Sequence, residues 1–340
     1  MKRTDIKDFL ELSHKYPVVD VRSPSEFAAG HIPDAINIPL FNDEERAVVG
    51  TVYKKEGRIP AIKEGLRLTG KAIHLKLEKA LEYAKEGKLL VHCWRGGMRS
   101  EAMAWLFSLG SIDCTVLSGG YKAYRNHILN SLSEKRNTIV LGGMTGSSKT
   151  HILQYLKEQG EQVIDLEGLA HHKGSAFGSL GQSPQPSTEQ FANDLFREFA
   201  ELDPGKPLWL EDESRNIGTV FMPDGFYFNM QRSKTIVLRM DIQTRLPRLL
   251  REYASFSPEL LKASVMKISK RLGGDNVRNA LESIDRGDLA KAITITLLYY
   301  DKAYEYSLKR KTEAGMIWVD TDTDDISLNA ARVMEAAGFR

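Results

Sequence analysis

The fold is decided at one stretch of the chain, Leu89-Leu90-Val91-His92-Cys93-Trp94-Arg95-Gly96-Gly97-Met98-Arg99-Ser100. Its apolar first part predicts a buried strand, and a helical pattern follows over 100–109. The loop between them begins at Cys93 and contains two glycines and two arginines. In that geometry backbone N–H groups can point inward, and the N-terminus of the next helix adds positive potential. Both effects favour a thiolate, so we expect Cys93 to be a nucleophile in an anion cradle, with Arg95 and Arg99 as its catalytic partners.

The composition indicates a globular protein without a membrane span. The 340 residues are enough for two domains, and 42% hydrophobic with 27% charged residues is typical of soluble chains. The mixed-charge start at 1–8 lacks the apolar core of a signal peptide. The only cysteines, Cys93 and Cys114, exclude a disulfide framework and a cysteine metal site. We therefore expect a protein of the reducing cytoplasm with no membrane partner.

Short apolar runs alternate with helical stretches on both sides of the Cys93 loop, which predicts an α/β fold with parallel sheets. The first part has predicted strands at 17–21, 89–92 and 114–117, and a loop followed by a brief strand within 31–39. A polar stretch at 131–137 predicts a domain boundary, giving domains 1–133 and 134–340. The second domain has predicted strands at 138–141, 162–166, 207–210, 235–238 and 316–320, and a mostly helical region over 243–310.

The second domain opens with a phosphate-binding motif, Gly143-Met144-Thr145-Gly146-Ser147-Ser148-Lys149-Thr150. It lies between a predicted strand and a predicted helix, where a P-loop wraps a diphosphate with its backbone amides. Gly143, Gly146, Ser147 and Ser148 would form the loop. Lys149 would reach a terminal phosphate, and Thr150 could contact Mg²⁺. Ser148 stands where the Walker pattern has glycine, so the motif predicts phosphate binding more firmly than NTP hydrolysis.

Three acidic residues, Glu211, Asp212 and Glu213, end a predicted strand of the same domain. A Walker-B-like carboxylate at this position would order a metal-bound water, so each is a candidate acid or metal-water ligand. Three adjacent acids are also common on solvated surfaces, and the sequence does not choose among them. No other metal site is predicted.

A set of basic residues in the helical region could hold a folded RNA through its phosphates, with Tyr253 and Phe256 available for stacking. Exposed helix faces are the alternative interpretation, because the evidence is charge alone. The set consists of Arg239, Arg245, Arg248, Arg251, Lys267, Lys270, Arg271 and Arg278, of which Arg245, Arg248, Arg251, Lys267, Lys270 and Arg271 are our candidate tRNA-binding residues.

Two different functions are also compatible with a nucleophilic Cys93 and a P-loop in one chain. The Cys-x5-Arg spacing from Cys93 to Arg99 also fits a phosphatase loop, in which the arginine binds phosphate through both nitrogens. Alternatively, the chain is a non-catalytic protein whose P-loop and cysteine domain dock partners. The first predicts turnover of phosphoryl substrates, and the second predicts an unreactive Cys93.

Two further segments distinguish these alternatives by resemblance. The segment at 18–35, which contains Asp20-Val21-Arg22-Ser23-Pro24-Ser25-Glu26, resembles the opening of rhodanese domains. Leu117-Ser118-Gly119-Gly120-Tyr121-Lys122-Ala123-Tyr124 resembles their closing signature. The resemblance implies a rhodanese-like N-terminal domain that carries a persulfide, or its selenium analogue, on Cys93. It also implies that Asp20 and Arg22 brace the fold.

A rhodanese unit ahead of a P-loop unit resembles the bacterial tRNA 2-selenouridine synthases over nearly the whole chain. The residues that carry this resemblance are the Cys93 loop, 41–46, 165–178 and 211–218. The resemblance implies a P-loop NTPase-like α/β domain with a helical C-terminal portion. It implies that 2-thiouridine at the tRNA wobble position is the substrate, and that selenophosphate and geranyl diphosphate are co-substrates.

In the implied scheme, geranyl diphosphate first alkylates the thiocarbonyl sulfur, and selenium then replaces the S-geranyl group. Cys93 would carry the selenium while Arg95, Arg99 and the loop amides hold the phosphate part of the donor. The P-loop around Lys149 would hold the diphosphate leaving group. The resemblance allows for a further partner, the enzyme that supplies selenophosphate. Candidates for the geranyl pocket are Phe221, Met222, Phe226 and Phe228.

Overall fold

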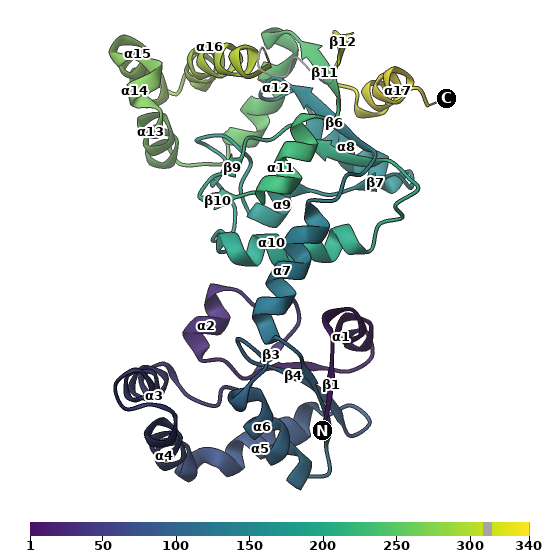
Figure 1. Ribbon diagram of the computed structural model, residues 1–340. Coiled ribbons are helices and arrows are strands. Elements are labelled where there is room, and N and C mark those ends of the chain that lie inside the picture. Colours follow the sequence, from purple (N-terminus) through teal and green to yellow (C-terminus); the bar gives the residue numbers. More distant parts are fainter. Residues whose placement is uncertain (309–314, 340) are drawn as a thin grey trace. The chain divides into compact units, whose positions relative to one another are not determined.

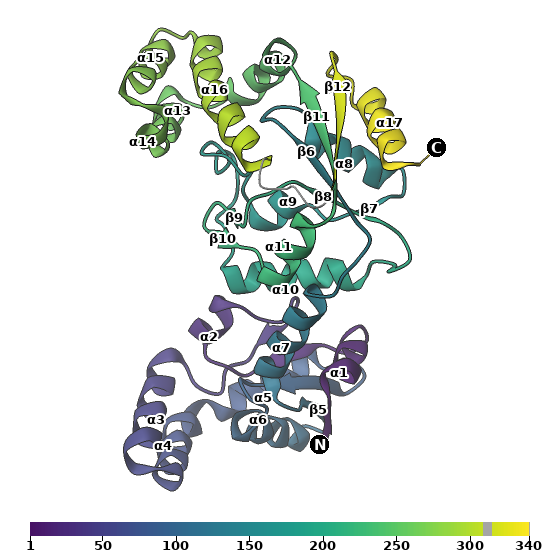
Figure 2. The same ribbon diagram turned by 45° about the horizontal axis from the view of Figure 1, so that its top comes forward.

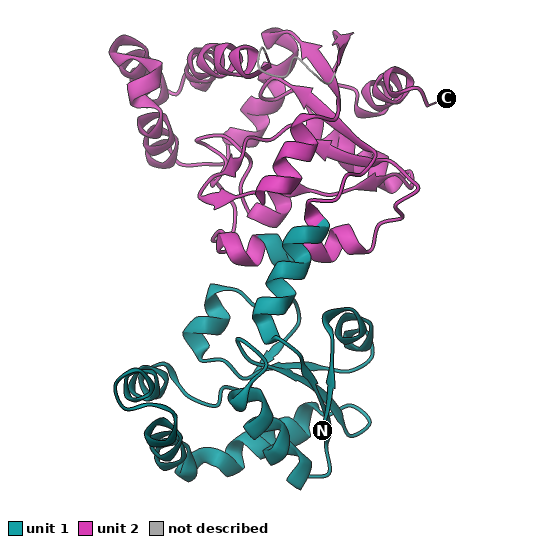
Figure 3. Ribbon diagram, viewed as in Figure 1, with its two compact units in different colours: residues 1–131, 192–194 teal, residues 132–191, 195–340 magenta. Residues whose placement is uncertain are grey.

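The computed structural model describes residues 1–308 and 315–339, which form two compact units (Figure 3). Unit 1 comprises residues 1–131 and 192–194, and unit 2 comprises residues 132–191 and 195–340. Each unit contains a five-stranded parallel sheet covered by helices, so the predicted α/β class is confirmed. No helix among the described residues is long and apolar enough to cross a membrane.

The sheet of unit 1 has the strand order β1-β5-β4-β2-β3, with every neighbouring pair parallel. Its strands are β1 (Lys2–Thr4), β2 (Val18–Asp20), β3 (Ile36–Asn37), β4 (Lys88–His92) and β5 (Asp113–Leu117). Its helices are α1 (Ile6–Ser13), α2 (Pro24–Ala29), α3 (Asp43–Glu56), α4 (Arg58–Thr69), α5 (Ile73–Tyr83), α6 (Met98–Leu109) and α7 (Gly120–Leu132), as Figures 1 and 2 label them.

The core of unit 1 explains why β4 lies at the centre of the sheet. Leu89 and Val91 of β4 are fully buried, and they belong to the same apolar cluster as Phe107 of α6 and Val116 of β5. A parallel strand that is buried on both faces is expected to be a continuous apolar run. Because the carboxyl ends of parallel strands meet at one edge, Cys93 follows β4 at the same edge at which β2 and β5 end.

Helices α3 and α4 form a hairpin that no motif predicted. Asn42 caps α3 through a capping box with Glu45, and Gly57, whose φ is 92°, makes the turn into α4. The two helices pack against each other.

The sheet of unit 2 has the strand order β12-β11-β6-β8-β7, again with parallel neighbours. Its strands are β6 (Thr138–Gly143), β7 (Gln162–Val163), β8 (Leu208–Glu211), β11 (Lys234–Met240) and β12 (Met316–Thr321). The strands β9 (Asn216–Ile217) and β10 (Val220–Phe221) form a separate antiparallel pair.

The helices of unit 2 fall into two groups. The first group contains α8 (Lys149–Glu158), α9 (Leu166–Ala170), α10 (Thr188–Ala200), α11 (Asp224–Gln231) and α17 (Ile326–Ala337). The helical region predicted over 243–310 contains α12 (Ile242–Tyr253), α13 (Pro258–Lys267), α14 (Ser269–Leu272), α15 (Gly274–Asp285) and α16 (Leu289–Leu308), and its last residues, 309 and 310, lie outside the described residues. Figures 1 and 2 both show α13 to α15 gathered at one side of the unit and α17 at the other.

The predicted strand at 162–166 is shorter than expected. It ends at Val163, and Asp165 then caps α9 by accepting a hydrogen bond from Gly168 N–H at 2.8 Å. An aspartate at this position favours a helix start over a longer strand.

Two loops at the strand ends of unit 1 pack backbone against backbone. The Tyr121 N–H donates to the Cys93 carbonyl at 2.8 Å, and the Lys122 N–H donates to the Trp94 carbonyl at 2.9 Å. A Cβ on Gly120, whose φ is 60°, would lie 2.3 Å from the Cys93 carbonyl oxygen. The approach therefore requires glycine, which explains the Gly119-Gly120 pair.

We expect Gly120→Ala to destabilise unit 1 much more than Gly87→Ala. Gly87 has a similar φ of 67°, but the nearest neighbour of its added Cβ, the Ser111 carbonyl oxygen, is at 3.8 Å, an ordinary van der Waals distance. Gly87→Ala should therefore cost only the left-handed backbone penalty, about 1 kcal/mol. Gly120→Ala adds a clash with backbone and should cost about 3 kcal/mol or more of the free energy of unfolding. Equal losses in chemical denaturation would contradict this packing.

Candidate functional site

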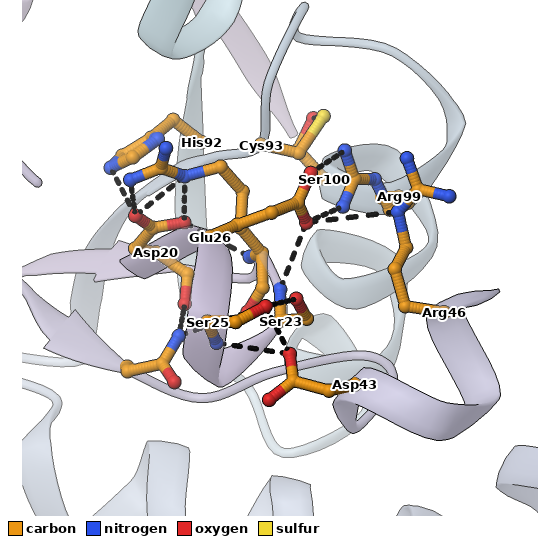
Figure 4. A network of polar contacts seen from close by, with 12 residues as sticks. Asp20, Ser23, Ser25, Glu26, Asp43, Arg46, His92, Cys93, Arg99 and Ser100 are labelled. Atoms are coloured by element: carbon orange, nitrogen blue, oxygen red, sulfur yellow. Dashed lines mark hydrogen bonds and ion pairs between the residues drawn. The ribbon is translucent and has the colours of Figure 1, made fainter. Parts of the chain in front are cut away.

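Cys93 lies at the base of its loop, directly after β4 and before α6 (Figure 4). The residue is only 3% exposed. Its Sγ is 3.3 Å from the Ser100 hydroxyl, and the Ser100 hydroxyl is 2.9 Å from the Gly97 carbonyl. The loop therefore surrounds the sulfur with polar groups from the first turn of α6.

These neighbours favour the ionised sulfur. Burial alone raises the pKa of Cys93, but the Ser100 hydroxyl, the Arg95 N–H and the Arg99 charge lower it by more, so the net pKa lies below its usual value. Burial raises the pKa of Cys114, in the sheet, to about 12. Cys93 is therefore the thiol of this chain that is suited to nucleophilic chemistry.

The Arg99 guanidinium is held by Glu26 of α2. Its Nη1 is 2.6 Å from Glu26 Oε2, and its Nη2 is 3.3 Å from Oε1. Burial raises the pKa of Glu26, but Arg99 and the Ser23 N–H lower it by more than burial raises it. The net pKa of Glu26 is therefore below its usual value, and the carboxylate is ionised. Glu26 also completes the capping box of α2 with Ser23. The Arg95 side chain, by contrast, is exposed, and its backbone N–H is the group that stabilises the thiolate.

Glu26 is a functional candidate that the sequence interpretation missed. The signal that could have found it is the Ser-Pro-Ser-Glu capping box at 23–26. Its role beside Arg99 follows only from the fold, because 73 positions separate the two residues.

Asp20 and Arg22 form a buried pair below the loop. Arg22 Nη2 is 2.6 Å from Asp20 Oδ2 and 2.7 Å from the Gly30 carbonyl, and its guanidinium lies 3.8 Å from the centre of the Tyr121 ring. Both side chains are fully buried. Because the pair has no access to solvent or to a substrate, its position fits a bracing role for both residues.

In unit 2, the loop between β6 and α8 has the backbone of a phosphate cradle. Gly143 has a φ of 153°, and its added Cβ would lie 2.5 Å from the Ser147 hydroxyl; Gly146 has a φ of 83°. Lys149 Nζ donates to the Gly143 carbonyl at 2.9 Å and lies 3.4 Å from Glu211 Oε1. The loop therefore brings a lysine side chain and the N-terminus of α8 together, and both attract an anion.

Ser148 adopts the backbone conformation that explains why glycine is usual at this position. Its φ is 67° and its ψ is 17°, in the left-handed region. Its hydroxyl donates to Asp324 Oδ1 at 2.8 Å, and the same carboxylate binds Arg248 at 2.8 Å. The serine is thus tied to the segment after β12.

The three adjacent acids separate in the structure. Glu211 accepts a hydrogen bond from the Thr150 hydroxyl at 2.8 Å, and Glu211 and Glu213 cluster with Glu167 of α9, with carboxylate oxygens within 4.8 Å of one another. Asp212 instead accepts from the Tyr304 hydroxyl at 3.1 Å. Alternating side-chain directions along an extended segment account for the split.

The cluster of carboxylates fits a divalent cation. Burial and the neighbouring carboxylates, Glu211 above all, raise the pKa of Glu167 and Glu213 well above the usual range. Oxygen ligands of this kind are those that Mg²⁺ prefers, and Thr150 adds a hydroxyl. The acid that would complete the set, Glu167, was not among the predicted ligands.

A cavity of about 440 Å³ opens over the P-loop. Of the predicted phosphate-binding residues, all except Ser147, which is fully buried, line it, and so do Glu167, Glu211, Asp212 and Glu213. A narrow apolar crevice between α12, α13 and α16 shares five lining residues with this cavity. They are Thr145, Ser175, Leu249, Tyr253 and Tyr300.

The aromatic and apolar residues suggested for a geranyl pocket do not line either cavity. Met222 and Phe226 are buried in the core, and Phe221 and Phe228 are about half exposed, at 48% and 51%. The apolar crevice formed by helices α12 to α16 is therefore a better candidate for the geranyl pocket than these four residues.

The basic residues of the helical region differ in their surroundings. Arg245 is only 1% exposed. Its Nη2 and Nη1 donate to the two Asp301 carboxylate oxygens at 2.6 and 3.0 Å, and its Nη1 also donates to the Thr145 carbonyl at 2.9 Å. The expectation that Arg245 faces RNA is therefore corrected: this side chain braces the P-loop. Arg248 is half-buried on Asp324, whereas the others remain exposed, namely Arg251, Lys267, Lys270 and Arg271.

We expect Ser100→Ala to move the pH dependence of Cys93 alkylation upward. The variant removes a hydrogen bond to a charged group, which is worth about 1.5 kcal/mol. Because this hydrogen bond lowers the pKa of Cys93 in the wild type, its loss raises that pKa. Because the thiolate fraction at a given pH falls as the pKa rises, the midpoint moves to higher pH. Mass spectrometry of iodoacetamide-labelled peptides measures it with Cys114 as the slow internal reference, and an unchanged midpoint would contradict the role of Ser100.

The P-loop makes a paired prediction for inorganic diphosphate. Lys149→Gln should weaken binding about tenfold or more, because a charge-assisted hydrogen bond is lost. Ser148→Gly should leave Kd within about threefold, because glycine adopts the left-handed conformation freely. Isothermal titration calorimetry measures both variants. If Ser148→Gly weakened binding as much as Lys149→Gln, the serine hydroxyl would be a direct ligand.

Comparison with known proteins identifies the family of both units. Residues 5–127 match the model of the rhodanese-like domain, and residues 136–332 match that of the tRNA 2-selenouridine synthase AAA domain. A tRNA 2-selenouridine synthase of Nitrosomonas europaea is 33% identical over 87% of this chain and 90% of its own length. Those of Shewanella pealeana and Shewanella piezotolerans are 35% and 37% identical over 89% and 88% of this chain and 91% and 90% of their own lengths. With one family model that matches more than half of the residues and relatives that align over most of both chains, this protein is an enzyme of the tRNA 2-selenouridine synthase family.

Proposed function

We propose that this enzyme converts 2-thiouridine at the tRNA wobble position to 2-selenouridine in two steps, in the cytoplasm. In the first, geranyl diphosphate alkylates the thiocarbonyl sulfur. In the second, selenium from selenophosphate, held at Cys93, replaces the S-geranyl group. The observation that carries this proposal is the presence of two differently equipped anion sites, one around a thiolate and one around a P-loop lysine.

The P-loop cavity supports the first step. Its loop amides and Lys149 would hold the diphosphate, and the sulfur would attack C1 of the geranyl group as the C–O bond to the diphosphate breaks. Mg²⁺, when bound by Thr150 and the Glu167, Glu211 and Glu213 carboxylates, would neutralise the charge of the diphosphate.

The adjoining crevice supports an isoprenoid rather than a nucleotide. An allylic diphosphate has a charged head and an apolar tail, and here a phosphate cradle meets an apolar crevice through shared residues such as Leu249 and Tyr253. The crevice measures about 20 Å³, so the chain would enter by parting α12, α13 and α16.

The Cys93 loop supports the second step. The Cys93 thiolate would attack selenium as the P–Se bond breaks, and the electron pair of that bond would leave with phosphorus, which gives a perselenide on Cys93 and phosphite. Arg95, Arg99 and the loop amides would hold the phosphorus anion, and Glu26 keeps the Arg99 guanidinium in place. The outer selenium atom would then form a bond to C2 of the base while the geranyl thiolate leaves with the electron pair of the C2–S bond. An external thiol would next attack the Cys93 sulfur, which releases 2-selenouridine with the electron pair of the Se–S bond and leaves a mixed disulfide that a second thiol reduces. Alkylation matters because it turns the sulfur into a better leaving group.

The remaining assignments follow from this scheme. We propose residues 1–133 as the selenium-transfer domain and residues 134–340 as the geranylation domain. The exposed residues Arg251, Lys267, Lys270 and Arg271 are proposed to contact tRNA phosphates. A selenophosphate-supplying enzyme is proposed as a donor partner.

Crossed variants test the two steps separately. With thiolated tRNA, geranyl diphosphate and selenophosphate, Cys93→Ala should accumulate S-geranyl-2-thiouridine and form selenouridine only at the background rate. Lys149→Gln should slow geranylation about tenfold or more, because it loses a charge-assisted contact to the leaving group. It should nevertheless selenate tRNA that is already geranylated at the wild-type rate. Nucleoside mass spectrometry measures all three species.

Two outcomes would contradict the proposal. Full selenation by Cys93→Ala would remove this residue from selenium transfer. Turnover of phosphate esters by the wild-type enzyme, without any selenated product, would favour the phosphatase interpretation of the Cys-x5-Arg loop.

A further inference from the structure

Unit 1 contains a large apolar groove that the two proposed anion sites do not use. Its volume is about 970 Å³, at the upper end of the range of about 300–1,000 Å³ that small-molecule sites occupy. The α3–α4 hairpin and α6 line it. Among its lining residues Tyr53, Leu66, Met98 and Trp105 are large apolar side chains that are 54%, 65%, 43% and 61% exposed.

The groove begins at the Cys93 loop. Met98 and Arg99 line it, and both belong to the first turn of α6, directly after the loop that starts at Cys93. Arg99 therefore takes part in both places: its charge lowers the pKa of Cys93, its guanidinium binds Glu26, and it lines the groove. An apolar surface of this size that is continuous with a reactive centre indicates a ligand more than a structural accident.

The charges on the groove fit a ligand attached to RNA. Arg46, Arg58 and Arg99 line it, together with one acidic residue, Glu101, which is ion-paired with Arg3. Arg46 and Arg99 share one partner, Glu26, so the arginines outnumber the carboxylates around the groove. An apolar floor with cationic side chains suits an apolar substituent on an anionic strand.

The proposed second step places a constraint on the geranyl chain. Selenium at Cys93 must come within bonding distance of C2, and the geranyl group is attached to the sulfur on that same carbon. The geranyl chain must then lie near Cys93, at a distance no greater than the length of the extended geranyl chain. The groove is lined by the first turn of α6 and can shield ten carbon atoms from water.

We propose that this groove binds the geranyl chain of S-geranyl-2-thiouridine while selenium is delivered from Cys93. The proposal rests on the two-step function above and adds a specificity site for its second step. The geranyl group thus binds to different apolar sites in the two half-reactions. It binds to the crevice of unit 2 during alkylation and to the groove of unit 1 during displacement.

The test compares two leucine variants that differ in their relation to the groove. Leu66→Glu places a charge in the groove, whereas Leu109→Glu places one on α6 at a residue that does not line it. The two leucines are 65% and 61% exposed, so neither variant should unfold the protein. Trp105→Ala is a second groove variant that removes apolar surface without adding charge.

Each full-length variant is assayed with selenophosphate and tRNA that carries either S-geranyl- or S-methyl-2-thiouridine. We expect Leu66→Glu and Trp105→Ala to raise KM for the geranylated tRNA at least tenfold. The same variants should leave KM for the methylated tRNA, selenium uptake by Cys93 and the geranylation of thiolated tRNA unchanged. Leu109→Glu should match the wild type in every assay.

The outcomes separate this proposal from the function on which it rests. If wild-type enzyme selenates geranylated tRNA but Leu66→Glu behaves like Leu109→Glu, the groove does not hold the chain; that result is also expected if it docks a protein or a second copy. An equal loss with the methylated tRNA would likewise overturn the proposal, because the effect would not depend on the chain. If wild-type enzyme fails to selenate geranylated tRNA, the two-step function itself is wrong.

Discussion

The reactive centre of unit 1 depends on the close backbone contact between the Cys93 loop and the turn at Gly119-Gly120. Hydrogen bonds from the first residues of α7 to the carbonyls of Cys93 and Trp94 fix the loop, and a side chain at Gly120 would prevent them. With the loop fixed, backbone N–H groups and the Ser100 hydroxyl face the sulfur. The thiolate is therefore favoured by groups whose positions the fold has already determined, and no reorganisation is needed when charge develops.

Unit 2 uses the same principle for a different anion. A central parallel strand, β6, ends in a loop that leads into a helix N-terminus, and a neighbouring strand, β8, brings carboxylates to the same edge. In unit 1 the corresponding edge carries a nucleophile, and in unit 2 it carries a lysine and a candidate cation site. A thiolate can accept selenium, and a lysine with a cation can stabilise a departing diphosphate, so the two edges suit successive steps on one base.

What the sequence predicted well was local. The Cys93 loop and the P-loop are each a strand, a short loop and a helix in continuous sequence, and both are present as expected. Contacts between distant segments were not predictable: Glu26 reaches Arg99 only because β2 and β4 are neighbours, and Glu167 joins Glu211 only through the sheet of unit 2. The burial of Arg245 was not predictable from the sequence either, because a charged side chain suggests exposure and the sequence does not reveal its distant partner, Asp301. The α3–α4 hairpin lacked a motif, although Asn42 and Glu45 form a capping box that marks its start.

The central claim is that selenium reaches the base through Cys93. A single-turnover transfer tests it most directly: the enzyme is incubated with isotopically labelled selenophosphate, freed of excess donor, and mixed with geranylated tRNA and unlabelled donor. The account predicts that the label leaves the Cys93 peptide and appears in the first equivalent of selenouridine. If the first selenouridine carried only unlabelled selenium while the label stayed on the protein, Cys93 would not be the carrier.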